Sequence, residues 1–192
     1  AHSGGVPRGF NLYSPQRHGD LHDQLQMLTI TKNSSHHLVS ELFHRYAEII
    51  IAHEESPDCL FESFCELRGF DLFSQLSQYY LQHVLNFLSM MLINLKKEQS
   101  IIYTMSQPLL SQLIDNPPKE DEGEAVEQYI SLLKSLATRL DASKVSLFFN
   151  CKGRNTLFPL AWRCAEFTSH PDCMLQTGCM TALLKIMKGK KQ

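Results

Sequence analysis

The chain lacks the features that define several large classes of protein. No apolar run approaches the roughly 20 residues that a membrane-spanning helix needs. The longest apolar stretches are Val84 to Leu88, which contains Asn86, and Met90 to Ile93. Eighteen Lys plus Arg against twenty Asp plus Glu leave a net charge of -2, so the surface has no basic excess that would gather nucleic acid. We therefore expect a soluble chain without a nucleic-acid partner.

Motifs for phosphate binding and catalysis are also missing. The sequence contains neither G-x-G-x-x-G nor G-x-x-x-x-G-K, and Cys151-Lys152-Gly153-Arg154 predicts only a short basic loop. No cysteine lies in a recognisable exposed elbow that would present a thiolate to a substrate. The sequence therefore predicts no catalytic residue, no cofactor and no small-molecule substrate.

The six cysteines do not follow a disulfide or zinc pattern. Among Cys151, Cys164, Cys173 and Cys179 the separations are 13, 9 and 6 residues, whereas structural zinc sites favour pairs such as C-x2-C. No dense cysteine framework of a small secreted domain is present, which favours a reducing, cytosolic setting. We predict no metal site. A cysteine hydrolase that would use Cys164 or Cys173 with His170 is an alternative that no motif supports.

Apolar residues recur three and four positions apart from residue 19 onward, which indicates helices with one apolar face. Four long segments carry such a stripe: Phe43, Tyr46, Ile49, Ile50; then Leu85, Leu88, Met91, Leu92, Leu95; then Ile130, Leu133, Leu136, Ala137, Leu140; and last Met180, Leu183, Leu184, Met187. The stripes superpose with offsets of 42, 45 and 47 residues. These offsets are close to the period of HEAT and armadillo repeats, whose helices bury their apolar faces by stacking on neighbours.

The intervals between the stripes predict shorter helices. These are expected at 57–67 and 70–78, at 98–106 and 108–114, and at 143–149 and 156–168. Breaks are expected at Gly69, before Pro108 and at Gly153, because Gly and Pro interrupt helices. Asn33 to Ser35, Ser56 with Pro57, and Ser169-His170-Pro171 are candidate helix starts. The sequence thus predicts an all-α, armadillo/HEAT-like right-handed helical solenoid of about three to four irregular repeats.

The chain divides into three parts. Residues 1–18, rich in Gly, Pro and Ser, predict a flexible extension or tag remnant. Residues 19–188 form the predicted helical repeat domain, and residues 189–192 a basic tail. Within the domain, residues 119–124 form an acidic loop that leads into the helix predicted at 124–141.

Polar residues on the backs of the long helices are the candidate binding surface. In a solenoid, equivalent helices of successive repeats line one wall, where polar side chains can meet a partner. The predicted partner-binding residues form a neutral strip beside the charged residues Glu41, Arg45 and Glu48: Gln82, Asn86, Ser89, Gln128, Ser131 and Ser135. Such a strip suits a peptide or a partner helix.

Several segments together resemble one known family. They are Leu28 to Asn33, Tyr129 to Leu136, Leu147 to Asn150, Phe158-Pro159-Leu160 and Ala165 to Asp172. In this order and spacing they resemble the FPL domain of the ema (endosomal maturation defective) family, whose human member bears a C-type-lectin name. The resemblance covers about residues 19–188, and Phe158, Pro159 and Leu160 match the motif that names the domain. Gln176 departs from the basic residue expected at its position.

The resemblance implies a cellular role that the helical period cannot supply. Members act in endosome maturation, autophagy and mitophagy from the cytoplasm, peripherally on endosomal, lysosomal or Golgi-derived membranes. Their partners include membrane-tethering complex subunits, Rab-type GTPases and a ubiquitin ligase, and no catalytic residue carries over. We therefore predict a non-catalytic scaffold or adaptor domain for protein–protein interaction in vesicle trafficking. The alternative is a regulator or subunit of a ubiquitin ligase.

Overall fold

The computed structural model describes residues 15–141, 143–148, 150–152, 155–157, 159–169, 171 and 173–189. Almost all of its regular structure is helical, as predicted. The α-helices are α1 (Pro15–Thr31), α2 (His36–Ala52), α3 (Leu60–Glu66), α4 (Gly69–Leu76), α5 (Leu81–Asn94), α6 (Glu98–Met105), α7 (Pro108–Asp115), α8 (Gly123–Arg139), α9 (Pro159–Glu166) and α10 (Cys173–Gly189). Two 3-10 turns are η1 (Val145–Phe148) and η2 (Phe167–Ser169).

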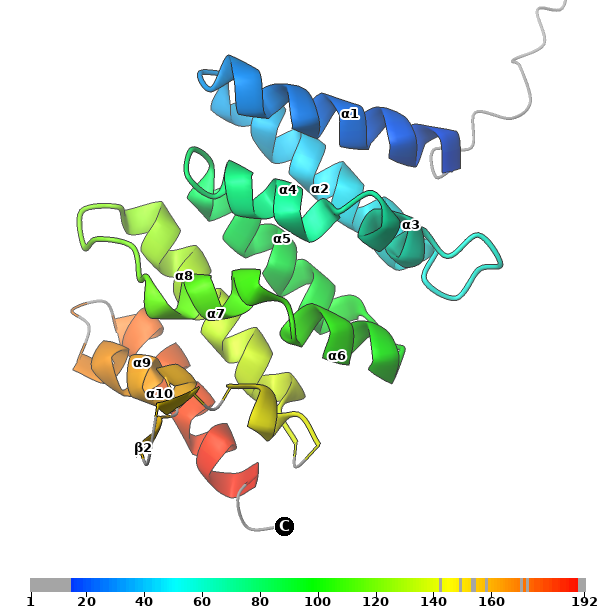
Figure 1. Ribbon diagram of the computed structural model, residues 1–192. Coiled ribbons are helices and arrows are strands. Elements are labelled where there is room, and N and C mark those ends of the chain that lie inside the picture. Colours follow the sequence, from blue (N-terminus) through cyan, green and yellow to red (C-terminus); the bar gives the residue numbers. More distant parts are fainter. Residues whose placement is uncertain are drawn as a thin grey trace, which may run out of the picture.

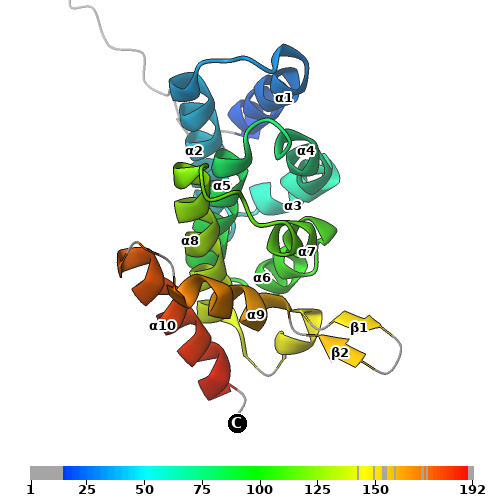
Figure 2. The same ribbon diagram turned by 90° about the vertical axis from the view of Figure 1, so that its left-hand side faces the viewer.

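The helices lie in two layers (Figure 1). One layer, the long-helix row, consists of α2, α5, α8 and α10, in which each helix contacts the next. Figure 2 shows α1, α3, α4, α6 and α7 on one side of this row. Contacts in the second layer run from α1 to α4, from α4 to α7 and from α7 to α9. In both layers, therefore, neighbouring helices follow the order of the chain.

Aromatic side chains fill the centre of the first half of the molecule. Tyr46, Phe64, Phe73 and Phe87 come from four helices, and each is at most 1% exposed. The ring centroids of Phe73 and Phe87 lie 4.4 Å apart at an interplanar angle of 78°, an edge-to-face contact that adds to the stabilisation from burial. The predicted stripe residues Phe43, Tyr46, Ile49 and Ile50 all lie in this core. The periodicity thus identified the buried face of α2.

Side chains that bridge the helices also satisfy helix ends. The guanidinium of Arg139, the last residue of α8, donates to the carbonyl oxygens of Leu92, Ile93 and Leu95 at the end of α5, over 2.7 to 2.8 Å. Arg163 of α9 donates likewise to Ile114 and Asp115 at the end of α7, over 3.2 and 3.1 Å. Because terminal carbonyls of a helix lack intrahelical partners, these bonds fix where neighbouring helices stop.

Several predicted boundaries are corrected by the structure. Helix α1 begins at Pro15 and His18 is buried, so residues 15–18 do not belong to an extension. Residues 1–14 lie outside the described residues. Ser35 caps α2 as predicted, accepting the N–H of Leu38 over 3.4 Å. The start predicted at Ser56-Pro57 is wrong, because α3 begins at Leu60 and the Ser56 hydroxyl donates to the carbonyl of His53.

The segment from residue 143 to 168 differs most from the sequence prediction. Instead of a first helix it holds η1 and a two-stranded antiparallel hairpin, β1 (Asn150–Lys152) paired with β2 (Asn155–Leu157). Asn150 lies opposite Leu157 and Lys152 opposite Asn155. Cys151 and Lys152 of the predicted basic loop therefore belong to β1, Gly153 and Arg154 lie outside the described residues, and α9 starts only at Pro159. Three-residue strands are too short to show an alternating pattern in the sequence.

The helix predicted to carry the last stripe forms, but three of the four stripe residues are exposed. On α10, Met180, Leu184 and Met187 are 49%, 54% and 58% exposed. Among the described side chains of α10, Cys179 and Ile186 are at most 3% exposed, and the stripe residue Leu183 is partly buried against the core. Helix α10 has apolar residues on two sides, and periodicity alone cannot tell which side packs against the protein.

Candidate partner-binding surface

A cleft lies where three helices of the long-helix row begin. It has a volume of about 540 Å³ and is bounded by the starts of α2, α5 and α8 together with the loops that precede α5 and α8. The residues that line it are Ser34, His36, Gln78, Tyr79, Tyr80, Leu81, Gln82, His83, Glu122, Gly123, Glu124 and Ala125. Gln82, a predicted partner-binding residue, belongs to this set.

The floor of the cleft contains a polar network. The side-chain amide nitrogen of Gln82 lies 3.1 Å from Nδ1 of His36 and 3.5 Å from Nε2 of His83. The two histidine rings are 4.7 Å apart between centroids. Burial and the neighbouring His36 lower the pKa of His83 to about 4, so this ring is neutral at pH 7. The network joins α2 to α5, and its His83 ring adds no positive charge at pH 7.

The cleft offers hydrogen-bond groups of both kinds. Neither α5 nor α8 has a side-chain cap at its start, so first-turn N–H groups such as those of Gly123 and Glu124 lack intrahelical partners. The carboxylates of Glu122 and Glu124 are acceptors in the same cleft. The ring of Tyr79, 46% exposed, has the Lys32 ammonium 4.9 Å from its centroid. Mixed donors, acceptors and an aromatic ring match the groups that a polypeptide segment presents.

The six predicted strip residues do not form one continuous surface. Gln82 and Asn86 on α5 and Gln128 and Ser131 on α8 are half-buried, with part of each side chain accessible. Ser89 and Ser135 are each 3% exposed. Their hydroxyls donate to carbonyls of their own helices, Ser89 to Leu85 over 3.0 Å and Ser135 to Ser131 over 2.8 Å. The two serines therefore belong to the packed interior, and their prediction as surface residues is wrong.

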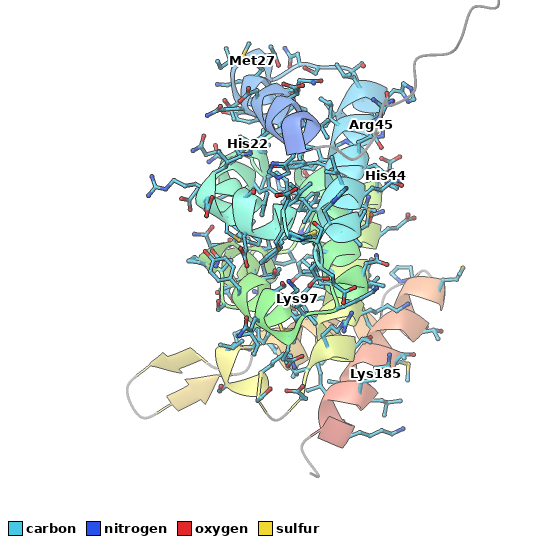
Figure 3. The ribbon with its side chains drawn as sticks, turned by 90° about the vertical axis from the view of Figure 1, so that its right-hand side faces the viewer. His22, Met27, His44, Arg45, Lys97 and Lys185 are labelled. Carbon is cyan, nitrogen blue, oxygen red and sulfur yellow. The ribbon has the colours of Figure 1, made fainter. Side chains whose placement is uncertain are left out.

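The charged residues predicted beside the strip are exposed on α2, and Figure 3 shows Arg45 on the outer side of this helix. Arg45 pairs with Glu41 one turn earlier, and Nε2 of His44 lies 3.1 Å from a carboxylate oxygen of Glu48. All four side chains are more than 40% exposed. Exposed pairs of this kind contribute little to stability, and none of these four residues lines the cleft.

The motif at residues 158–160 lies at the start of α9. Phe158 lies outside the described residues, Pro159 is the first residue of α9 and Leu160 is fully buried. Pro159 and Leu160 border a small cavity of about 260 Å³, together with Ile114 and Asp115 of α7 and Leu147 and Phe148 of η1. A proline at a helix start needs no N–H partner there. The described part of the motif thus anchors α9 against α7.

Two of the four cysteines whose spacing was compared with that of zinc sites, Cys164 and Cys179, are buried in the interior. Cys164 and Cys179 are fully buried, and burial raises the pKa of Cys164 to about 12 and that of Cys179 to about 11. Among the residues whose side chains the structure describes, no group of three His, Cys, Asp or Glu could hold a metal ion. His170 and the side chains of Cys151 and Cys173 lie outside the described residues. Cys164 has neither the exposure nor the thiolate character of a nucleophile.

Sequence reasoning missed most of the cleft. It selected Gln82 but not His36, Tyr79 or Glu124, which come from segments far apart in the chain. The cap at Ser35 and the loop before α8 did indicate where helices begin. The repeat offsets predicted that α2, α5 and α8 stack side by side, but no sequence signal showed that their starts leave a cleft between them.

Comparison with known proteins identifies the family. Residues 43–187, more than half of the chain, match the FPL family, which is described as an uncharacterised conserved protein. The chain belongs to the FPL family. The sequence resemblance is thereby confirmed for the segment that runs from α2 almost to the end of α10.

Curated relatives of this FPL-family chain come from animals and a plant. It is 24% identical to mouse Protein CLEC16A over 183 residues, which are 93% of the chain and 18% of the mouse protein. It is 26% identical to Protein TRANSPARENT TESTA 9 of Arabidopsis thaliana over 172 residues, 86% of the chain and 20% of that protein. The Drosophila melanogaster CLEC16A homolog is 23% identical over 192 residues. The chain thus spans about a fifth of the length of these relatives, and no solved structure matches it.

Within the described residues, no helix combines the length and the hydropathy that crossing a bilayer requires.

Proposed function

We propose that this FPL-family chain is a non-catalytic scaffold or adaptor domain that binds a polypeptide segment of a partner in the cleft at the starts of α2, α5 and α8. The cleft is the observation that carries the proposal. Its polar groups come from three successive helices of the long-helix row, which gives a partner several points of contact on one continuous wall. Half-buried Asn86, Gln128 and Ser131 extend this polar surface along α5 and α8.

The scaffold is, in this proposal, an armadillo/HEAT-like right-handed solenoid with a repeat of about 45 residues. Polar contacts between successive units support it, because their sequence separations are similar to one another. Gln82 contacts His36 across 46 residues, Glu54 contacts Lys96 across 42, and Arg139 contacts Ile93 across 46. Lys185 reaches Thr138 across 47. Repeats that each contact only their neighbours produce this spacing.

The cellular role in this proposal is endosomal trafficking and autophagy or mitophagy, with the protein held peripherally on endosomal, lysosomal or Golgi-derived membranes. The similarity to CLEC16A proteins over nearly the whole chain supports this role. Membrane-tethering complex subunits, a Rab-type GTPase and a ubiquitin ligase are the proposed partners. Because the chain corresponds to about a fifth of these relatives, the proposal concerns this domain alone.

The test is partner capture by a cleft variant. The double variant His36→Ala/Gln82→Ala removes the side chains that join α2 to α5 at the cleft floor, and both are accessible enough for the fold to survive. Purified wild type and variant are compared for capture of tethering subunits, Rab-type GTPases and ubiquitin ligases from a cell lysate, quantified by mass spectrometry. We expect roughly tenfold lower capture by the variant, as for loss of a binding hot spot.

A matched control is Arg45→Ala, which removes an exposed polar side chain of α2 that does not line the cleft. This variant should capture partners as well as the wild type does. Equal capture by the cleft variant, or capture of metabolic enzymes alone by the wild type, would contradict the proposal. Circular dichroism of each variant establishes that its helices are intact.

A further inference from the structure

Helix α10 has two apolar sides, and the part of the chain that the structure describes packs against one of them. Cys179 packs with Val126 and Ile130 of α8. A Cβ at Gly178 would lie 3.0 Å from the Lys134 side chain, also on α8, so this side of the helix is in tight contact. Met180, Leu184 and Met187 project from the opposite side and are about half exposed. Three large apolar side chains thus form a second stripe in solvent.

The spacing of the stripe fits a helix as its occupant. Met180, Leu184 and Met187 stand at positions i, i+4 and i+7, which lie above one another along two turns. In the long-helix row, α5 contacts α2 and α8, and α8 contacts α5 and α10. Helical spacing places the stripe on the side of α10 turned away from Gly178 and Cys179, the residues that contact α8. A further helix on this side would continue the packing already seen within the chain.

Charge on α10 defines the partner further. The sequence of α10 contains no Asp or Glu, while Lys185 and Lys188 lie on its exposed surface. Lys185 already donates to the Thr138 hydroxyl over 3.0 Å, but Lys188 borders the stripe. A second copy of α10 could not supply an acid to pair with Lys188. A complementary helix therefore carries Asp or Glu beside its apolar residues.

We propose that Met180, Leu184 and Met187 form a docking surface for an amphipathic helix of a partner protein, with apolar residues at matching spacing and acidic residues on its flank. Methionine suits such a surface, because its flexible thioether adapts to partners of different shape. The surface is separate from the cleft at the starts of α2, α5 and α8. The docking proposal can therefore be tested independently of the function proposed above.

The test is selection from a phage-displayed library of helical peptides whose positions are randomised. Peptides are selected on the wild-type chain alone, and their binding to Leu184→Glu, which places an acid in the centre of the stripe, is measured afterwards. We expect the surviving peptides to carry apolar residues at i, i+4 and i+7, with Asp and Glu outnumbering Lys and Arg at flanking positions. Their affinity for Leu184→Glu should be at least about tenfold weaker.

Controls separate the docking surface from a general loss of fold. Ile93→Glu alters another exposed apolar residue, 57% exposed on α5, and should leave peptide binding unchanged. Met187→Glu repeats the test at the end of the stripe if Leu184→Glu does not fold. Both stripe variants should keep the wild-type unfolding temperature, because the replaced side chains are half exposed.

Four results would overturn the proposal. Selected peptides without an acidic bias, or peptides that bind Leu184→Glu as well as the wild type, would show that this stripe is not the binding surface. A concentration-dependent dimer in sedimentation, lost in Leu184→Glu, would assign the surface to a second copy. Binding to phosphatidylserine vesicles that Leu184→Glu abolishes, without any selected peptide, would assign it to a lipid surface.

Discussion

The carboxylate of Glu54 accepts a hydrogen bond of 2.7 Å from the backbone N–H of Lys96, 42 residues further along the chain. Its other oxygen accepts the N–H of Lys97 over 2.9 Å. Glu54 is 1% exposed, and Lys97 is the N-cap of α6, a helix with no side-chain cap of its own. A side chain from the loop after α2 thus satisfies the start of a helix in the next unit.

We predict that Glu54→Ala lowers the free energy of unfolding by about 2–3 kcal/mol, because two hydrogen bonds to a charged acceptor are lost. Urea titration measures this change. The neighbouring Glu55 provides a matched control, since its pair with Lys96 has both side chains more than 60% exposed. Glu55→Ala should change the stability by less than about 0.5 kcal/mol. Equal losses in the two variants would contradict the role of Glu54.

Gly69 allows the Phe64 ring to lie against the start of α4. A Cβ at this position would stand 2.0 Å from Cε2 of Phe64, a ring that is fully buried and cannot move freely. We predict that Gly69→Ala lowers the free energy of unfolding by about 1–3 kcal/mol through overpacking. Thermal and urea unfolding measure the loss.

Two further variants test this explanation. Adding Phe64→Leu to Gly69→Ala should recover part of the loss, giving a favourable coupling energy in a double-mutant cycle. Gly123→Ala places a Cβ at a position where nothing lies within 4 Å, and stability should stay the same or rise by up to about 1 kcal/mol. If the two glycine variants behaved alike, backbone freedom rather than the Phe64 contact would explain Gly69.

How far the sequence predicts this molecule depends on the kind of contact. The stripe of α2 predicted its buried face, because residues such as Phe43 and Tyr46 follow the helical period and have nowhere else to pack. For α10 the same reasoning chose Leu184, which is 54% exposed, because both sides of the helix are apolar. Contacts such as that of Glu54 with Lys96 depend on how successive helical repeats stack. No local pattern in the sequence predicts them.

Two buried histidines predict sensitivity to acid. His18 and His22 of α1 are 2% and 6% exposed, and Nδ1 of His22 lies 2.9 Å from the Tyr46 hydroxyl. Burial, helped by His22, lowers the pKa of His18 to about 4, and burial also lowers the pKa of His22, against the opposing effect of Asp23. The unfolded chain, with ordinary histidine pKa values near 6.5, takes up protons first.

Stability is therefore complete above about pH 6.5 and falls as the pH drops towards about 4. For His18 alone the loss is on the order of 2–3 kcal/mol. His18→Phe should flatten this part of the profile, though not all of it, because the pKa of His83 is also lowered to about 4. Urea titrations between pH 7 and 4 measure the effect. Gln24→Ala, at an exposed position of the same helix, should keep the wild-type slope; a His18→Phe profile with that same slope would refute the assignment.

Cys164 and Cys179 should be unreactive in the folded protein. Both side chains are fully buried, and burial raises the pKa of Cys164 to about 12. At neutral pH the thiolate of Cys164 is then present in on the order of one molecule in 10⁵, and alkylating reagents attack the thiolate. We predict iodoacetamide labelling at Cys164 and Cys179 at least about 100-fold slower in native protein than in denaturant. Peptide mass spectrometry resolves each site, with half-buried Cys59 as an internal comparison. Labelling of native Cys164 at the rate of a free thiol would reopen the hydrolase alternative, because a nucleophile must be both accessible and ionised.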